Sequence, residues 1–340
     1  MSAVTSSRLR IRTGFHTRKS MRLTIIALAM LAALGISPAG AQEWPSRPIT
    51  LVQGFGAGGN TDSIARVLAE ALSRALGASF IVEAKPGAGG RLASEAVAKA
   101  APDGHTLILL TGAHASSAAM HRKLRYDPLE SFAFVSLVGR FPFVIATRPD
   151  GPVRSLEDLV RVIREEPGKL TYSSAGFGSV QHLTGELLSL SAGGKLTHVP
   201  YRGGTQPLTD LMSGQIDLIF DTLTATIPGI EAGTLRGLAV TSSTAWPAIP
   251  SVLPVASRLP GFEVISWVGL AAPAGTPTAV IDKLRAALDV AARDPDVQRR
   301  LTALGVETGF STPQEMRLFI ADQVKRWNAV IDQAGLPRHD

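Results

Sequence analysis

Short apolar runs alternate with amphipathic helical patterns along most of this chain. In the first helical pattern, Ile64, Leu68 and Leu72 recur at helical spacing, and Gly77 provides a stop signal. Alternation of strands and helices predicts α/β layers with largely parallel sheets. The apolar runs with the length of strands span residues 49–53, 80–84, 106–111, 134–138, 143–147, 170–174, 196–201, 216–221, 235–241 and 264–270.

The pattern changes after Pro277, where the sequence predicts helices without strands. In the last of these helices Met316, Ile320 and Trp327 fall on one face. Helices with no sheet of their own have to pack on an earlier one, so we expect two lobes joined by a hinge of two chain crossings. The expected ranges are residues 42–146 with 267–340 for the first lobe and residues 147–266 for the second.

Residues 1–41 have the features of a secretory signal peptide. They contain six basic residues and no acidic one, an apolar stretch over residues 23–36, and a small-residue cleavage site that ends at Ala41. Because the apolar stretch is short for a membrane span, we favour cleavage after Ala41 over a retained anchor, with translation starting at Met1 or Met21. The sequence therefore predicts an exported, periplasmic protein.

Composition and charge exclude several classes of function. The net charge of +6 comes from the leader, since the remaining residues hold equal numbers of acidic and basic side chains. A neutral mature chain gives no reason to expect binding to nucleic acid or to an anionic membrane. The chain has no cysteine, which rules out disulfides, thiolate metal sites and a cysteine nucleophile. Its histidines are scattered, so we expect neither a metal nor a cofactor.

A glycine-rich turn, Gly-Phe-Gly-Ala-Gly-Gly-Asn-Thr-Asp, covers residues 54–62 between the first strand and the first helix. Such a turn offers free N–H groups and the positive end of a helix to an anion. Gly54, Gly56 and Gly59 also fit the dinucleotide fingerprint, and Glu83 ends the next strand, near where a ribose-binding acid would lie. A third interpretation is a tight turn that only allows close packing. The export signal lacks a twin-arginine pair, which favours the anion site over the nucleotide site.

A second turn of the same kind, Ser-Ser-Ala-Gly-Phe-Gly-Ser, covers residues 173–179 in the other half of the chain. Two such turns predict a ligand that is held from both sides. Ser179 either caps the following helix or forms a serine hydrolase site with His182. The Gly-x-Ser-x-Gly elbow of hydrolases is missing, and no acid is evidently placed to orient His182.

Polar side chains end two of the expected strands in the second half. Asp221 ends one strand and Tyr201 ends another. The carboxyl ends of strands in open α/β sheets point at the ligand cleft. Asp221 therefore either receives an amine or N–H group of a ligand or holds a loop amide.

Together and in this order, these motifs resemble the Bug-type solute-binding proteins of tripartite tricarboxylate transporters. The first turn is similar to the family's Pro-Phe-x-Ala-Gly-Gly-x-x-Asp. Residues 83–90, Glu-Ala-Lys-Pro-Gly-Ala-Gly-Gly, are similar to its Glu-Asn-Arg-Pro-Gly-Ala-Gly-Gly. The resemblance covers essentially the whole mature chain. Further segments similar to family motifs are residues 101–107, 126–128, 172–176, 198–203, 220–221 and 271–277.

The resemblance implies a two-lobed, type II-like periplasmic binding protein fold, in which each lobe is a mostly parallel sheet flanked by helices. It implies a non-catalytic monomer that binds a small organic acid or amino acid, mostly through backbone amides, and passes it to membrane permease subunits. The ligand-binding residues that it implies are Phe55, Gly56, Ala57, Gly58, Gly59, Asp62, His114, Ser174, Ala175, Gly176, Ser179, His182, Tyr201 and Asp221.

The sequence departs from the family pattern at both turns. Gly54 stands where proline is usual, which loosens the unbound turn. Phe177 stands where a small or polar residue is common, and it either narrows the pocket or favours an apolar ligand. Three alternatives stay open: an exported serine hydrolase that uses the same cleft, a nicotinamide-dependent oxidoreductase, and a sensor that presents its ligand to a receptor.

Overall fold

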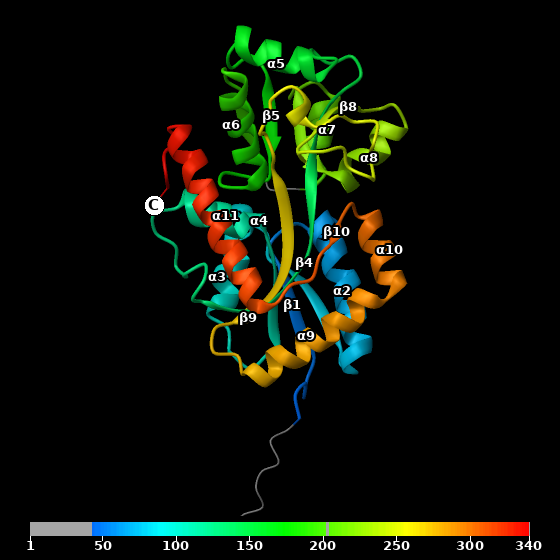
Figure 1. The fold of residues 1–340 in the computed structure, drawn as a ribbon, viewed down its shortest axis with the longest axis vertical. Coiled ribbons are helices and arrows are strands. Elements are labelled where there is room, and N and C mark those ends of the chain that lie inside the picture. The colour runs from blue at the N-terminus through cyan, green and yellow to red at the C-terminus, as the bar shows by residue number, and fades with distance from the viewer. Residues whose placement is uncertain (1–42, 202–203, 340) are drawn as a thin grey trace, which may run out of the picture. The chain divides into compact units, whose positions relative to one another are not determined.

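The structure of the protein, a computed structural model, describes residues 43–201 and 204–339. The expected signal peptide and its cleavage point after Ala41 lie outside the described residues. The chain from Arg47 onward forms one compact unit, and the fold is that of this unit. Its strands pair into two sheets that share one long strand, and helices pack against both of them (Figure 1).

The first sheet combines strands from both ends of this unit. Its strands are β1 (Ile49–Gln53), β2 (Phe80–Ala84), β3 (Thr106–Thr111), β4 (Phe132–Thr147), β9 (Ile265–Pro273) and β10 (Glu307–Thr308). They are ordered β2–β1–β3–β9–β4, and β10 pairs with β4. β1 runs parallel to β2 and β3, whereas β9 runs antiparallel to β3 and β4. The expectation of helices alone after Pro277 is therefore wrong at β10.

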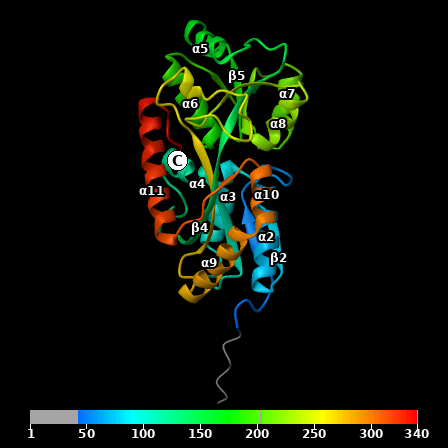
Figure 2. The same cartoon turned by 45° about the vertical axis from the view of Figure 1, so that its right-hand side comes forward.

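Helices from the C-terminal third pack on those from the N-terminal third, as Figures 1 and 2 show. The helices beside the first sheet are α2 (Asn60–Leu76), α3 (Arg91–Ala98), α4 (Gly112–Met120), α9 (Thr278–Arg293), α10 (Pro295–Ala303) and α11 (Pro313–Gln333). α9 and α10 contact α2, whereas α11 contacts α4 and β4. α11 buries Met316, Ile320 and Trp327 on the face that the sequence predicts. A capping box formed by Thr312 and Glu315 begins this helix.

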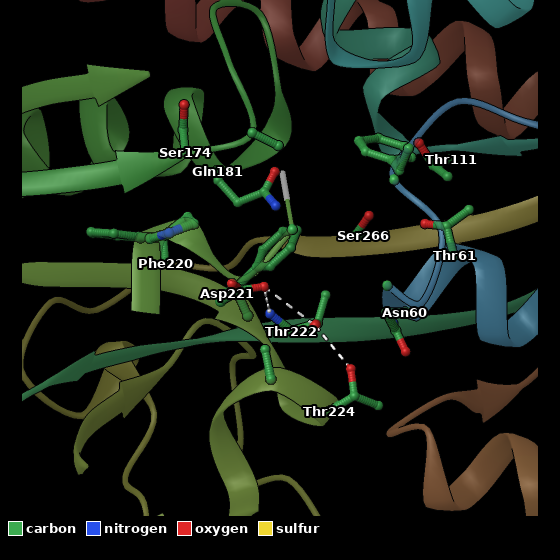
Figure 3. A pocket seen from close by; sticks show the side chains of 18 of the residues that line it. Asn60, Thr61, Thr111, Ser174, Gln181, Phe220, Asp221, Thr222, Thr224 and Ser266 are labelled. Carbon is green, nitrogen blue, oxygen red and sulfur yellow. Dashed lines mark hydrogen bonds between the residues drawn. The ribbon is translucent and has the colours of Figure 1, made fainter. Parts of the chain in front are cut away.

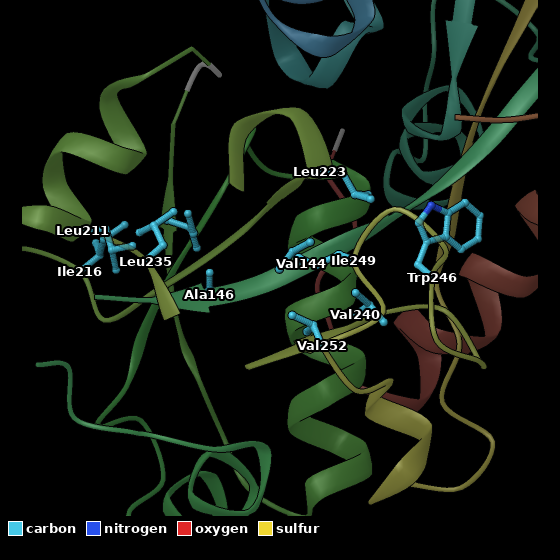
Figure 4. Close-up of a cluster of buried hydrophobic side chains, with 11 residues drawn as sticks. Val144, Ala146, Leu211, Ile216, Leu223, Leu235, Val240, Trp246, Ile249 and Val252 are labelled. Carbon is cyan, nitrogen blue, oxygen red and sulfur yellow. The ribbon is translucent and has the colours of Figure 1, made fainter. Parts of the chain in front are cut away.

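The second sheet contains the end of β4 and four further strands that lie between β4 and β9 in the sequence. These are β5 (Thr171–Ser174), β6 (Thr197–Pro200), β7 (Leu218–Thr222) and β8 (Arg236–Val240), and the helices are α5 (Leu156–Glu165), α6 (Val180–Ala192), α7 (Gln206–Met212) and α8 (Leu223–Glu231). β5 runs parallel to β6 and β7, and β4 runs antiparallel to β7 and β8. A buried cluster that includes Val144, Ile219 and Trp246 packs beside this sheet (Figure 4).

β4 is one strand, whereas the sequence predicts two, at residues 134–138 and 143–147. Gly139 and Pro142 suggest a break, but both pair with β9, and the strand continues through a register shift between Leu137 and Gly139. Gly139 is needed because a Cβ atom there would lie 2.6 Å from the carbonyl oxygen of Glu307 in β10. From Phe143 onward β4 pairs with the second sheet. One strand therefore enters both sheets.

Both sheets are mixed rather than mostly parallel. The α/β class is confirmed, but β4, which enters both sheets, and β9 run antiparallel to each other and to their other partners. Parallel pairing is confined to β1 with β2 and β3 and to β5 with β6 and β7. Within the described residues, no helix combines the length and the apolar composition needed to span a bilayer.

Candidate ligand-binding site

A cavity of about 460 Å³ lies at the carboxyl ends of strands from both sheets (Figure 3). One wall is formed by the first glycine turn and the start of α2, which follow β1. The other wall is formed by the ends of β5 and β7 and by the starts of α7 and α8. Further lining residues come from β4 (Phe141 and Phe143), from β9 (Ser266), from the end of β3 and start of α4 (Thr111 and Ala113), and from the start of α6 (Val180 and Gln181). The two glycine turns therefore both reach the same cavity.

Side chains beneath the first turn fix its backbone. The Phe55 N–H donates to the side-chain oxygen of Gln53 at 2.7 Å, and the Gly58 N–H donates to Asp62 at 3.0 Å. Gln53 also donates to Asp62 at 3.3 Å. Gly54 packs closely against Gly90: any side chain at position 54 would place its Cβ atom 2.6 Å from the Gly90 Cα atom, which is too close. Close packing thus explains Gly54, while residues 55–61 of the turn line the cavity.

Asp62 supports the turn from the inside and does not line the cavity. It is 2% exposed and lies in the first turn of α2. Burial alone would raise its pKa, but hydrogen bonds from Arg66, Gly58 and Gln53 and the charge of Arg66 outweigh burial and hold that pKa below its ordinary value. Asp62 is therefore an ionised group that holds the Gly58 amide in place.

The start of α2 presents polar groups to the cavity. Gly59 is the N-cap residue, so no side chain caps the helix. Asn60 and Thr61 line the cavity, and both polar atoms of the Asn60 amide are buried without a hydrogen-bond partner in the described structure. The Asn60 amide has almost no exposed surface, so an anion at this positive helix end would meet backbone N–H groups and the Thr61 hydroxyl.

The second turn is organised by Ser174 and His198. The Ser174 hydroxyl donates to the Gly176 carbonyl, accepts from the Gly176 N–H at 3.0 Å, and lies 2.5 Å from His198 Nε2. Burial lowers the pKa of His198 to about 3, so its imidazole is neutral. Ser174 and Ala175 line the cavity, whereas Gly176 does not. Gly176 adopts a φ of 110°, which a side chain would strain.

Ser179 and His182 are engaged in building this turn. The Ser179 hydroxyl accepts from the His182 backbone N–H and so caps α6. His182 Nδ1 accepts from the Gly178 N–H at 3.3 Å, and burial lowers the pKa of this imidazole to about 4. Neither residue lines the cavity. Ser179 and His182 therefore form no nucleophile–base pair facing a substrate, which argues against a hydrolase built on these two residues.

Three other residues singled out in the sequence also lie away from the cavity lining. The Tyr201 hydroxyl donates to Asp210 at 2.7 Å. His114 lies 2.9 Å from the Pro128 carbonyl through Nε2 and 3.2 Å from the Ser94 hydroxyl through Nδ1. Phe177 is 52% exposed and stacks edge-on against His182 and His198, so it does not narrow the cavity.

The structure brings together eight of the residues implied by the resemblance. Those that line the cavity are Phe55, Gly56, Ala57, Gly58, Gly59, Ser174, Ala175 and Asp221. Those that do not are Asp62, His114, Gly176, Ser179, His182 and Tyr201. Lining residues that the sequence reasoning missed include Asn60, Thr61, Thr111, Gln181, Thr222, Thr224 and Ser266. Most of these missed residues come shortly after the end of a predicted strand. Their position after a strand end is the sequence signal that could have identified them.

The charge of the lining is unusual for a site expected to hold an anion. Its described residues include no Lys, Arg or His, and Asp221 is their one acidic member. Glu83, the acid of the possible dinucleotide fingerprint, pairs with Lys85 at 2.6 Å and is not part of the lining. No group of acidic or histidine side chains suited to a metal ion occurs in the described residues.

Comparison with known proteins gives concordant results. The family described as "Tripartite tricarboxylate transporter family receptor" matches residues 64–336. The periplasmic binding protein BugD is 34% identical with a TM-score of 0.81, over 86% of this chain and 99% of BugD. Rpa4515 of R. palustris, solved with adipate, is 36% identical with a TM-score of 0.82, over 87% and 99%. MatC (Rpa3494) of Rhodopseudomonas palustris, solved with malate, is 34% identical with a TM-score of 0.79, over 85% and 100%.

Proposed function

Because the chain belongs to the tripartite tricarboxylate transporter receptor family, we propose that it is a periplasmic solute-binding protein that holds a small carboxylate in the cavity described above. The family consists of transport receptors and not of enzymes. The similar proteins Rpa4515 and MatC were solved with adipate and malate. The proposed ligand is a small organic acid or amino acid, which the protein, as a monomer, delivers to permease subunits in the membrane.

One observation carries this proposal: the first glycine turn and the uncapped start of α2 line a cavity that has no basic side chain among its described residues. A carboxylate there would be held by backbone N–H groups, hydroxyls and the positive end of α2. Hydrogen bonds to a charged group contribute about 1.5–3 kcal/mol each. A few of them support micromolar binding, which corresponds to about −8 kcal/mol.

We propose direct ligand contact for the predicted residues that line the cavity. The remaining predicted residues act through the turns. Asp62 holds the Gly58 amide, and Ser179 and His182 hold the second turn. Gly176 gives that turn its backbone conformation, Tyr201 holds α7 through Asp210, and His114 holds the Pro128 carbonyl.

The proposed lobes are residues 42–146 with 267–340 and residues 147–266. Their support is the pairing of β4, which joins β9 in the first sheet and β7 and β8 in the second. Bending of β4 and β9 would let the two walls of the cavity close on a ligand and exclude water. The proposed export signal is cleaved after Ala41, and an intact mass of the exported protein that begins at Gln42 tests this.

Blocking the cavity tests the binding proposal. Ala57 and Ala225 are exposed lining residues on opposite walls, so tryptophan at either position fills the cavity without entering the core. Ala75 is an equally exposed residue of α2 that does not line the cavity, and Ala75→Trp is the matched control. Native mass spectrometry first identifies any co-purified small molecule. Isothermal titration calorimetry then measures the binding affinity of seven compounds: succinate, glutarate, adipate, malate, β-alanine, 4-aminobutyrate and 5-aminopentanoate.

We expect at least one carboxylate to bind the unmodified protein and the Ala75→Trp variant equally. Ala57→Trp and Ala225→Trp should each lower the affinity for that carboxylate by about tenfold or more, equivalent to 1.4 kcal/mol. Carboxylate binding that survives both cavity variants at full strength, or a co-purified ligand without a carboxylate, would overturn the proposal.

A further inference from the structure

Asp221 has an unused oxygen at the cavity. It lies in β7 near its end, and Figure 3 shows it beside the space between the two walls. Its Oδ1 atom accepts from the Thr222 N–H at 2.7 Å and from the Thr222 hydroxyl at 3.3 Å. Within the described residues, Oδ2 accepts no hydrogen bond. Asp221 thus holds a loop amide with one oxygen and leaves the other for a ligand.

The surroundings of Asp221 leave its charge unbalanced. The described lining residues on both walls include no basic side chain and no second acid. Burial raises the pKa of Asp221 to about 6, and the hydrogen bonds from Thr222 offset this only in part. Above that pH the group is ionised, so it attracts a protonated amine and repels a second carboxylate.

The opposite wall of the cavity favours a negatively charged group. There the start of α2 has no side-chain cap, which leaves backbone N–H groups of its first turn without a partner in the helix. Thr61 adds a hydroxyl beside it (Figure 3). The positive helix end and these donors favour a carboxylate. The two walls come from different sheets, so a ligand that satisfies both would also hold them together.

We infer that the ligand is an amino carboxylate, whose carboxylate meets the start of α2 and whose protonated amine meets Asp221, and not a dicarboxylate. This inference rests on the proposed function, since it names the class of ligand within the same cavity. It separates this chain from Rpa4515 and MatC, whose structures were solved with the dicarboxylates adipate and malate.

Matched pairs of probes test the inference. In each pair, a dicarboxylate is compared with the amino acid in which one carboxylate is replaced by an ammonium group: succinate with β-alanine, glutarate with 4-aminobutyrate, and adipate with 5-aminopentanoate. Calorimetric titrations at pH 8 keep Asp221 ionised and the amines protonated. They are repeated with Asp221→Asn, which keeps the shape of the side chain and removes its charge.

We expect the amino member of the best-binding pair to bind at least about tenfold more tightly than its dicarboxylate, a difference of 1.4 kcal/mol. Asp221→Asn should weaken the amino member by about tenfold or more and leave the dicarboxylate unchanged or strengthened. The comparison within each pair needs no variant, so it remains decisive even if Asp221→Asn fails to fold. Arg202 lies outside the described residues, and Arg202→Ala is titrated in parallel. If that variant is the one that abolishes amine selectivity, the role given to Asp221 is wrong.

The inference and the proposed function fail in different ways. A dicarboxylate that binds as tightly as its amino partner, and that Ala57→Trp displaces, overturns the inference and leaves carboxylate binding in the cavity intact. Binding that Ala57→Trp and Ala225→Trp do not affect overturns the proposed function itself.

Discussion

The strongest stability prediction concerns Asp62→Ala. This substitution removes the carboxylate that accepts from Gly58 at 3.0 Å and from the fully buried Gln53 at 3.3 Å. Hydrogen bonds to a charged group contribute about 1.5–3 kcal/mol each, and a buried donor left without a partner costs about 1–3 kcal/mol. The Gln53 bond is long, so we expect a total loss of about 2–4 kcal/mol in the free energy of unfolding.

Arg66→Ala is the matched control for this variant. Arg66 pairs with Asp62 at 2.9 Å, but its side chain is 61% exposed. Only the Arg66 end of the pair is exposed, so water can replace part of this interaction, and we expect Arg66→Ala to cost about 1 kcal/mol, the upper end of the range for surface ion pairs. Urea denaturation of both variants therefore separates the contribution of the buried hydrogen bonds to the free energy of unfolding from that of the ion pair.

The two outcomes differ clearly. If Asp62→Ala lowers the free energy of unfolding no more than Arg66→Ala does, the buried hydrogen bonds do not support the turn. A variant that loses stability should also bind its carboxylate more weakly, because the Gly58 amide is no longer fixed at the cavity. Calorimetry below the unfolding transition measures this second effect.

Two further predictions concern buried groups. Burial holds the pKa of His114 at about 4, so the unfolded chain binds more protons between pH 6.5 and 4, and stability falls as pH falls through this range. The loss approaches about 3 kcal/mol at 1.4 kcal/mol per unit. Burial also lowers the pKa of His182 and His198, so His114→Gln should reduce the slope of the stability profile without abolishing it, and an unchanged slope would contradict the assignment. Gly185→Ala would place a Cβ atom 2.3 Å from the Tyr172 ring, so we expect a loss of about 1–3 kcal/mol, whereas Gly309→Ala meets no atom within 4 Å and should be neutral in thermal unfolding.

Local patterns predicted most of the fold because the strands are apolar and the helices amphipathic. The first three strand ranges are confirmed residue for residue. β4 was predicted wrongly because Gly139 and Pro142 usually interrupt strands. The partners that keep them in a strand, Val268, Ile265 and Thr308, lie far away in the sequence. Pairing at such separation leaves no local signal.

The site was predicted less completely, for a related reason. A glycine turn after a strand indicates where backbone N–H groups are free, and both turns reach the cavity. The direction of each side chain, however, depends on contacts across the fold. Asp62 points inward to Gln53, and His182 receives the Gly178 amide, so both stabilise turns and neither lines the cavity.

The division between supporting and lining residues bears on how the protein selects its ligand. Asp62, Ser179 and His182 are all engaged within the protein, so the cavity retains backbone amides, hydroxyls, side-chain amides and one carboxylate. Amides and hydroxyls hold a carboxylate with little regard for the rest of the molecule. Asp221 differs because it carries the one full charge among the described lining residues. Selection between carboxylates that fit the cavity should therefore depend on the group that each presents to Asp221.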